Sequence, residues 1–260
     1  MADIVKLSSH ERTKPALGGF VQTEAALDIQ RTLNKVQASG GGQMGLIVGQ
    51  PGCGKTQSMW DFQRANPGAV VCNVTAGEGG AFGAAQQLML TLDMMGEPNS
   101  RKLAAERRRI GEKIGCGNML LIDEAQYMVQ FNTRGADSWL ALEWLRSMAD
   151  ECYINIALIG DLFLLGMETA LPQLWGRVST NRPVIIRETA KADVEVIAAS
   201  FRIADATSLQ VLRSVSKRGG LRQVANCCRH AWVISGGQQP RAEDIGAAVE
   251  DLKIFDMRGK

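Results

Sequence analysis

The feature that constrains this chain most is one stretch near its start, GLIVGQPGCGKTQSMW, residues 45–60. An apolar run leads directly into three glycines, which are followed by Lys55 and Thr56. Residues 49–56 fit the pattern GxxxxGK[ST], the P-loop, in which main-chain N–H groups turn inward around phosphate oxygens at the start of a helix. The sequence therefore predicts a buried strand, a phosphate-binding loop and a helix in immediate succession.

The P-loop also predicts individual contacts. The ammonium group of Lys55 is expected to reach the β- and γ-phosphates of ATP, and the hydroxyl group of Thr56 is expected to ligate Mg²⁺. The alternative is a glycine-rich turn between strand and helix that binds nothing. The residues predicted to bind the nucleotide here are Gly49, Gln50, Pro51, Gly52, Cys53, Gly54, Lys55, Thr56 and Gln57.

The rest of the chain predicts the fold class. Five short, continuously apolar runs are typical of strands buried on both faces; they are residues 44–49, 69–74, 119–123, 154–160 and 183–187. Helical patterns alternate with them, from Thr23 and near residues 55–65, 82–95, 100–114 and 137–150. This alternation predicts an α/β fold, a five-stranded parallel P-loop sheet with helices on both faces.

After Arg187 the strand signal disappears. Helical periodicity then continues to the end of the chain, in residues 191–203, 207–217, 221–235 and 241–256. We therefore expect three parts: a flexible N-terminal arm at 1–18, an α/β nucleotide-binding domain at 19–189, and a small all-helical lid subdomain at 190–260.

Composition argues against a membrane or secreted protein and does not show whether the chain binds nucleic acid. The chain has 260 residues, 45% of them hydrophobic and 22% charged, which is typical of a globular protein. No apolar run approaches the roughly 18 to 20 residues that cross a bilayer, and no secretion signal is visible, so we expect a cytoplasmic protein without a membrane partner. The net charge of +2 does not by itself require nucleic-acid binding.

A pair of carboxylates follows the third apolar run, in MLLIDEAQ, residues 119–126. Asp123 is expected at the end of a central strand, where it can hold the water shell of Mg²⁺. Glu124 can orient and deprotonate an attacking water, which favours ATP hydrolysis over phosphoryl transfer to a small molecule. For Gln126 two roles stay open, sensing of the γ-phosphate and a helix-cap hydrogen bond.

The helical tail contains a third element, SKRGGLRQVANCCRHA, residues 216–231. Its two adjacent glycines permit a change of direction, and Arg222 then falls in the first turn of a helix. An arginine there can fold over a nucleotide and contact its γ-phosphate from the same chain. The alternative is a solvated arginine on a helix surface.

These three elements in this order, followed by a helical lid, resemble the AAA+ ATPases over roughly residues 20–256. GQPGCGKT resembles their Walker A motif, LLIDEAQ their Walker B motif, and GGLRQVAN their sensor 2 motif, usually G-D-L-R, with Gly220 in place of the acid. Within that superfamily, GFVQTEAALDIQRTLNKV ahead of the P-loop is similar to the DNA transposition proteins of the phage Mu B type and their relatives TniB and TnsC.

The resemblance implies an ATP-dependent DNA-binding ATPase that assembles on double-stranded DNA, without sequence preference, as a ring or helical filament. Such an ATPase would select target DNA for a transposase and stimulate that enzyme.

The resemblance also implies an arginine at the start of the last strand that reaches the nucleotide of a neighbouring subunit. Arg177 lies there, with Arg182 as the substitute. Asp161 occupies the sensor 1 position, where Asn, Ser or Thr is usual. Phe20 to Thr23 match a segment near the adenine, although a hydrophobic staple explains Phe20 and Val21 equally well.

Contacts to DNA are expected from local basic clusters. SRKLAAERRRIGEK, residues 100–113, is the richest, and on a helix Arg101, Lys102, Arg108 and Arg109 fall near one side. The alternative is a solvated outer helix in which Glu106 pairs with the arginines. Further candidates, from loops that the family presents to the centre of its assembly, are Arg134 and residues 75–83.

Two other kinds of ATPase share these motifs. A replication-type loader has the same ATPase chemistry. A secretion ATPase of the ExeA kind would need a membrane anchor and a periplasmic module after the ATPase, which we do not expect here. An ATP-gated scaffold without hydrolysis is disfavoured by Glu124.

Overall fold

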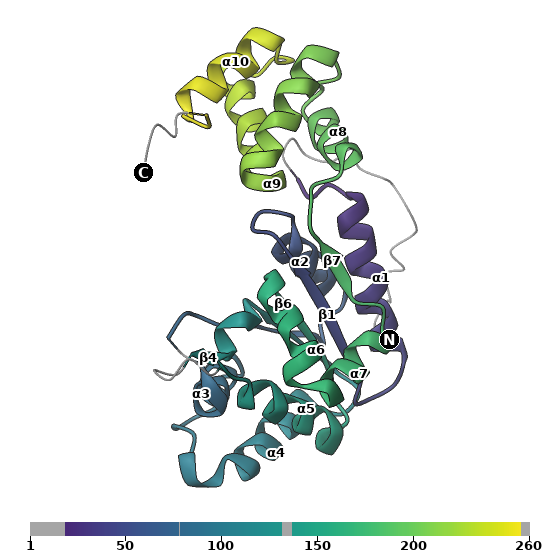
Figure 1. The fold of residues 1–260 in the computed structure, drawn as a ribbon, viewed down its shortest axis with the longest axis vertical. Helices are drawn as coiled ribbons and strands as arrows, with labels where there is room; N and C mark the ends of the chain where they lie inside the picture. Colours follow the sequence, from purple (N-terminus) through teal and green to yellow (C-terminus); the bar gives the residue numbers. More distant parts are fainter. Residues whose placement is uncertain (1–18, 78, 132–136, 256–260) are drawn as a thin grey trace, which may run out of the picture.

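A five-stranded parallel sheet forms the centre of the molecule (Figure 1). The computed structural model describes residues 19–77, 79–131 and 137–255. The strand order is β2-β3-β6-β1-β7, with bounds β1 (Met44–Gly49), β2 (Val70–Asn73), β3 (Met119–Asp123), β6 (Asn155–Gly160) and β7 (Val184–Ile186). The predicted fold class is therefore confirmed. The predicted arm at 1–18 lies outside the described residues.

The pairing of the strands determines which loops meet. β1 lies between β6 and β7, and β3 pairs with β6 on the other side. In the register, Val48 is opposite Gly160 and Ile122 is opposite Leu158. The loops that follow β1, β3 and β6 therefore leave the sheet at the same edge, where ligands bind in open α/β sheets.

Helices cover both faces of the sheet, which explains why the strands are apolar throughout. In β1, Leu46 and Val48 belong to one buried cluster and Ile47 to the other, as the alternation of a strand requires. One face is covered by α1 (Glu24–Ala38) and α2 (Lys55–Ala65). The other face is covered by α3 (Gly80–Thr91), α4 (Leu103–Ile114), α5 (Leu140–Cys152), the short α6 (Met167–Ala170) and α7 (Pro172–Thr180).

The C-terminal helices form a lid beyond the sheet, at the top of Figure 1. They are α8 (Lys191–Ser200), α9 (Ala206–Ile234) and α10 (Ala242–Asp251), and they share their own buried cluster. α9 changes direction at Gly219 and Gly220, and Gly220 has a φ of 64°, in the left-handed region that favours glycine. The predicted domain boundary after 189 falls in the link between β7 and α8 and stays a prediction.

Several local predictions differ from the structure. The two helices expected at 207–217 and 221–235 are the halves of the kinked α9. The helix expected at 137–150 begins only at Leu140, because residues 137–138 form β5 (Asp137–Ser138), antiparallel to β4 (Gln130–Phe131). The helix expected at 100–114 is divided, with a separate 3₁₀ turn, Ser100–Lys102, ahead of α4.

α9 extends over 29 residues, as two helical halves that meet at Gly219 and Gly220. Neither α9 nor any other helix in the described parts of the chain is long and apolar enough to cross a membrane. The cytoplasmic location expected from the sequence stays a prediction.

Candidate nucleotide-binding site

The P-loop connects β1 to α2. Gly52 (φ +78°) and Gly54 (φ +99°) both adopt left-handed backbone conformations, and a Cβ atom at Gly52 would come within 2.5 Å of the carbonyl oxygen of Gly219 in the lid. α2 begins at Lys55 directly after this turn. The loop therefore leads into a helix N-terminus, whose free N–H groups and positive dipole end favour an anion.

Lys55 lies against the P-loop that precedes it. Its ammonium nitrogen donates to the carbonyl oxygens of Gly49 at 2.7 Å and Gln50 at 3.1 Å. The positive charge is thus held beside the loop glycines, where the sequence predicts the phosphates of ATP.

Thr56 and Asp123 meet between α2 and the end of β3. The Thr56 hydroxyl donates to Asp123 Oδ2 at 2.8 Å, and the backbone N–H of Glu124 donates to Asp123 Oδ1 at 3.0 Å. Asp123 is 4% exposed, and this burial raises the pKa of its carboxyl group, although both hydrogen bonds act in the opposite direction. A hydroxyl and a buried carboxylate are oxygen ligands that suit Mg²⁺, and a cation there would favour the ionised carboxylate. The donor set therefore fits the predicted metal.

Glu124 and Gln126 follow β3. Glu124 has φ 55° and ψ 37°, a left-handed conformation that is uncommon for a residue other than glycine. Gln126 donates through Nε2 to Glu124 Oε2 at 2.6 Å, and its Oε1 accepts the backbone N–H of Asp161 at 3.1 Å. The side-chain hydrogen bonds of Gln126 are thus to Glu124 and to the residue after β6, and sensing of the γ-phosphate stays a prediction.

Asp161 lies at the sensor 1 position, directly after β6. Its Oδ1 accepts the backbone N–H of Phe163 at 3.0 Å, so the carboxylate caps the short turn that follows. A role in positioning the attacking water stays a prediction.

A cleft of about 790 Å³ lies at this edge of the sheet, within the range of roughly 300 to 1,000 Å³ that is usual for small-molecule sites; of the predicted nucleotide-binding residues, Gly49, Gln50 and Asp123 do not line it. The P-loop, Glu124, Gln126 and Asp161 form its polar wall. Apolar side chains come from the segment before α1 and from the lid: Phe20, Val21, Ile197, Phe201, Leu221 and Ala225. The cleft thus combines the P-loop with apolar surface that suits a nucleobase, and a position of Phe20 and Val21 beside an adenine stays a prediction.

Arg222 joins the lid to the P-loop. Its backbone N–H donates to the carbonyl oxygen of Gly52 at 3.0 Å, and its side chain lines the cleft. The kink at Gly219 and Gly220 makes this approach possible. Arg229 also lines the cleft and was not predicted from the sequence. Its spacing of seven residues from Arg222 places both on one helix face, which is the signal that would have found it.

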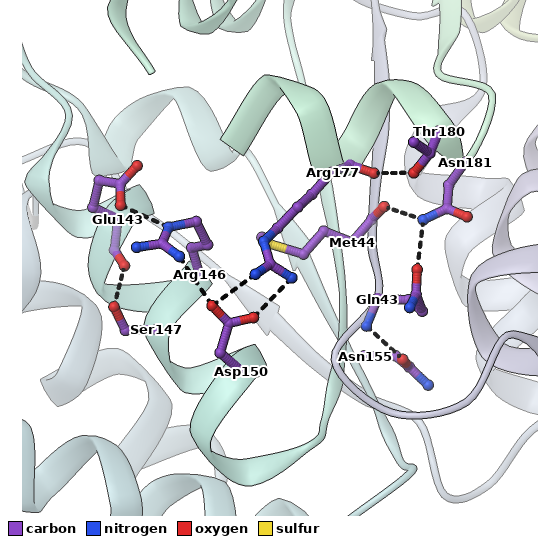
Figure 2. A network of polar contacts seen from close by, with 10 residues as sticks. All are labelled: Gln43, Met44, Glu143, Arg146, Ser147, Asp150, Asn155, Arg177, Thr180 and Asn181. Carbon is purple, nitrogen blue, oxygen red and sulfur yellow. Dashed lines mark hydrogen bonds and ion pairs between the residues drawn. The ribbon is translucent and has the colours of Figure 1, made fainter. Parts of the chain in front are cut away.

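Arg177 lies far from this cleft. It occupies the last turn of α7, and its guanidinium group contacts both carboxylate oxygens of Asp150 in α5, at 2.8 and 3.0 Å. Figure 2 shows the same carboxylate between Arg177 and Arg146, whose Nη1 lies 2.9 Å from Asp150 Oδ2. The sequence predicted Arg177 ahead of the last strand, and the structure places it on a helix that ends at Thr180, before β7 begins at Val184; its role at a neighbouring nucleotide stays a prediction. Pro172 begins a helix here, and the residues buried along it are Leu174 and Val178.

The position of α7 explains this separation. Next to its end, Asn181 donates to the carbonyl oxygen of Met44 at 2.9 Å, and Met44 is the first residue of β1 (Figure 2). The P-loop follows the last residue of β1, about 20 Å away for a six-residue strand. Arg182, the substitute for Arg177, is also at this far edge; its carbonyl oxygen accepts from Thr32, and its side chain lies 3.8 Å from Asp28.

The basic cluster does not form one helical surface. Arg101 and Lys102 belong to the 3₁₀ turn ahead of α4, whereas Arg108 and Arg109 belong to α4 itself. Arg108 pairs with Glu151 at 3.4 Å, and Arg109 pairs with Glu106 at 3.2 Å. A role in DNA binding stays a prediction, and Arg134 lies outside the described residues.

Two family models match the chain. The model described as "AAA domain" matches residues 38–167, which is 130 of the 260 residues. The model described as "Mu B transposition protein, C terminal" matches residues 179–252. Together they cover most of the described sheet and the lid.

Individual proteins agree with the family models. The chain is 25% identical over 234 residues to the ATP-dependent target DNA activator B of Escherichia phage Mu, covering 86% of this chain and 70% of the relative. It is 24% identical to the protein of the same name from Escherichia phage D108, with the same coverage. Among solved structures, the ORC1 protein of Aeropyrum pernix in complex with DNA is similar, with a TM-score of 0.61 and 13% identity over 92% of this chain and 68% of that one. At that identity the likeness concerns the fold alone.

Proposed function

The chain belongs to the AAA domain family, and on that premise we propose that it hydrolyses ATP in the cleft between P-loop and lid in order to select target DNA for transposition. One observation carries the ATPase part. Lys55, Thr56 and Glu124 line one cleft at an edge of the sheet, and the buried Asp123 lies next to them, where it accepts from the Thr56 hydroxyl. These are the groups that phosphate binding, metal binding and activation of water require.

In this proposal each group has one task. The N–H groups at the start of α2 and the ammonium group of Lys55 bind the phosphates. Thr56 and Asp123 hold Mg²⁺, which supplies charge neutralisation at the phosphates when bound. Glu124 accepts a proton from the attacking water, and Arg222 contacts the γ-phosphate from the lid of the same chain.

Arg177 completes the site of a neighbouring copy. Because it lies at the opposite edge of the sheet from the P-loop, it serves a nucleotide only across an interface between two copies. Asp150 holds the guanidinium group through two contacts and limits its freedom before assembly. Hydrolysis is then slow in the isolated chain and faster in a ring or filament, since the transition-state charge is stabilised from outside.

The transposition part of the proposal is supported by the relatives. Their name describes them as ATP-dependent activators of target DNA, and the match to the Mu B C-terminal family includes the lid. The partners would be double-stranded DNA, bound without sequence preference, further copies of the chain, and a transposase. The basic residues proposed to contact phosphates are Arg101, Lys102, Arg108, Arg109 and Arg134.

A titration with duplex DNA tests this proposal. Binding by the full chain is measured with ATP, with ADP and without nucleotide, over a series of salt concentrations and with duplexes of unrelated sequence. We expect tight binding only with ATP, similar affinities for all sequences, and an affinity that falls steeply with salt. Binding that is independent of nucleotide and of salt would contradict the proposal.

A further inference from the structure

The amide of Gln126 bridges the ends of two neighbouring strands. β3 and β6 pair in parallel, and Glu124 and Asp161 are the residues that follow them. Gln126 contacts both, through Nε2 to Glu124 Oε2 and through Oε1 to the backbone N–H of Asp161. This bridge joins the residue expected to activate water to the strand end at the sensor 1 position.

The chemistry of the two partners fixes the orientation of the amide. A backbone N–H only donates, so it requires the carbonyl oxygen of Gln126 on the side of Asp161. An ionised carboxylate only accepts, so it requires the NH₂ group on the side of Glu124. Both ends of the side chain are thereby satisfied in one orientation, and a reversed amide would lose both hydrogen bonds.

The surroundings leave Gln126 little freedom. The residue is only 9% exposed, and a Cβ atom at Gly160 would lie 2.4 Å from its Oε1. Only glycine at 160 leaves room for the amide at that place. Glu124 has its left-handed backbone conformation just beside it, a strained arrangement that persists where neighbouring contacts maintain it.

From this geometry we infer that Gln126 is a positioning residue, which holds the carboxylate of Glu124 toward the nucleotide and ties it to the end of β6. The inference rests on the proposed ATPase function and deepens it. Gln126 donates to Oε2 of the carboxylate, so the hydrogen bond orients the group while Oε1 can face the attacking water. Its removal is expected to affect the turnover of bound ATP more than the binding of ATP.

Two substitutions separate positioning from a purely structural role. Gln126→Ala removes both hydrogen bonds. Gln126→Glu keeps an oxygen for the N–H of Asp161 but places a second carboxylate against Glu124. If the side chain only supports the end of β6, Gln126→Glu retains activity; if it positions Glu124, this variant is as impaired as Gln126→Ala.

The experiment measures kcat, KM and ATP affinity of the full chain with Mg²⁺ and duplex DNA. We expect both variants to lose about 10- to 100-fold in kcat, the effect usual for residues that orient a ligand or catalytic group, with ATP affinity within about threefold. The matched control is Gln30→Ala, since Gln30 also donates an amide N–H to a carboxylate, Asp61 Oδ2 at 2.7 Å, outside the residues that line the cleft. It should keep full turnover.

A double-mutant cycle gives a second readout. In a Glu124→Gln background, Gln126→Ala should cause no further loss of kcat, because Gln126 acts through Glu124. Equal losses in both backgrounds, or full activity of Gln126→Glu, would overturn the inference while leaving the proposed function intact. An unimpaired Glu124→Gln variant would instead overturn the role of Glu124 itself.

Discussion

The two edges of the sheet differ in where the proposed partners of their functional groups lie, within the same chain or in another copy. At the edge that carries the P-loop, which we call the nucleotide edge, Lys55, Thr56, Asp123 and Glu124 already contact one another or their own loop. At the opposite edge, which we call the arginine edge, Arg177 is bound to Asp150 in a network that also includes Arg146 and Glu143 (Figure 2). The nucleotide edge is arranged within one chain, whereas the arginine edge has its proposed target in another copy.

Because of this difference, substitutions at the two edges should affect ATP binding and ATP turnover differently. Together, the groups at the nucleotide edge should determine ATP affinity, chiefly through Lys55, and chemistry, chiefly through Glu124, because both residues line the cleft. The arginine edge should affect turnover alone, and only in an assembly. Variants at each edge test this division.

The largest effect is expected for Glu124→Gln. Loss of a general base typically costs about 10² to 10⁴-fold in rate, so kcat should fall by about 10³-fold. ATP affinity should persist, since the amide is nearly isosteric, and the protein should accumulate as an ATP-bound assembly. Turnover assays and sedimentation with ATP check both; turnover at the original rate would exclude Glu124 as the base.

The second-largest effect is expected for Arg177→Ala, a loss of about 10²-fold in kcat, which is typical of removing a group that stabilises transition-state charge. ATP affinity of the isolated chain should not change. Arg182→Ala serves as the comparison, because Arg182 is also at the arginine edge and was the substitute prediction. If Arg182→Ala is the inactive variant and Arg177→Ala is active, the assignment moves to Arg182.

Lys55→Ala should weaken ATP binding by about 10- to 100-fold, the value of a lost charge-assisted hydrogen bond. The control is Lys35→Ala, whose ammonium group also donates to a carbonyl oxygen, that of Thr180 at 2.8 Å, but at the arginine edge. Equilibrium titration with ATP distinguishes the two. Tight binding by Lys55→Ala would refute the assignment of the phosphate loop.

The smallest effect concerns the stability of the lid. The backbone N–H of Ser208 donates to Asp205 at the start of α9 and lowers the pKa of that carboxyl group. A lowered pKa means that the contribution is present above the ordinary carboxyl pKa and is lost as pH falls through the folded value. Asp205→Ala should therefore destabilise the protein by about 1 kcal/mol at neutral pH and by less in acid.

Asp205→Asn is the matched control, because asparagine also caps a helix but does not titrate in this range. Thermal unfolding at neutral and acidic pH compares the three proteins. Equal losses at both pH values would contradict the assigned cause. ATP affinity of the folded variants should match that of the parent chain, since neither edge is altered.

The features that were predicted correctly from the sequence are those encoded in short, continuous segments. The buried strands, the P-loop and the Asp123–Glu124 pair are encoded within short segments, and their meeting follows from the rule that parallel strands end at one edge. Arg222 was predicted because two glycines preceded it. No helix was predicted for the segment that forms α7, although Pro172 marks its start.

Contacts between distant segments could not be predicted in this way. Gln126 and Asp161 are 35 residues apart and meet only because β3 and β6 are neighbours. Arg107 and Glu151 pair between α4 and the end of α5, which removes part of the charge of the basic cluster. Such pairs depend on strand order and helix packing, which no local pattern specifies.

A mixture of two impaired variants tests the division between the edges most directly. Glu124→Gln keeps Arg177 but lacks the base, and Arg177→Ala keeps the base but lacks the arginine. If Arg177 acts in a neighbouring copy, an equimolar mixture with ATP and duplex DNA should regain about one quarter of the parent turnover, since random assembly pairs an intact cleft with an intact arginine at that frequency. A mixture no more active than the mean of the two separate variants would contradict the account.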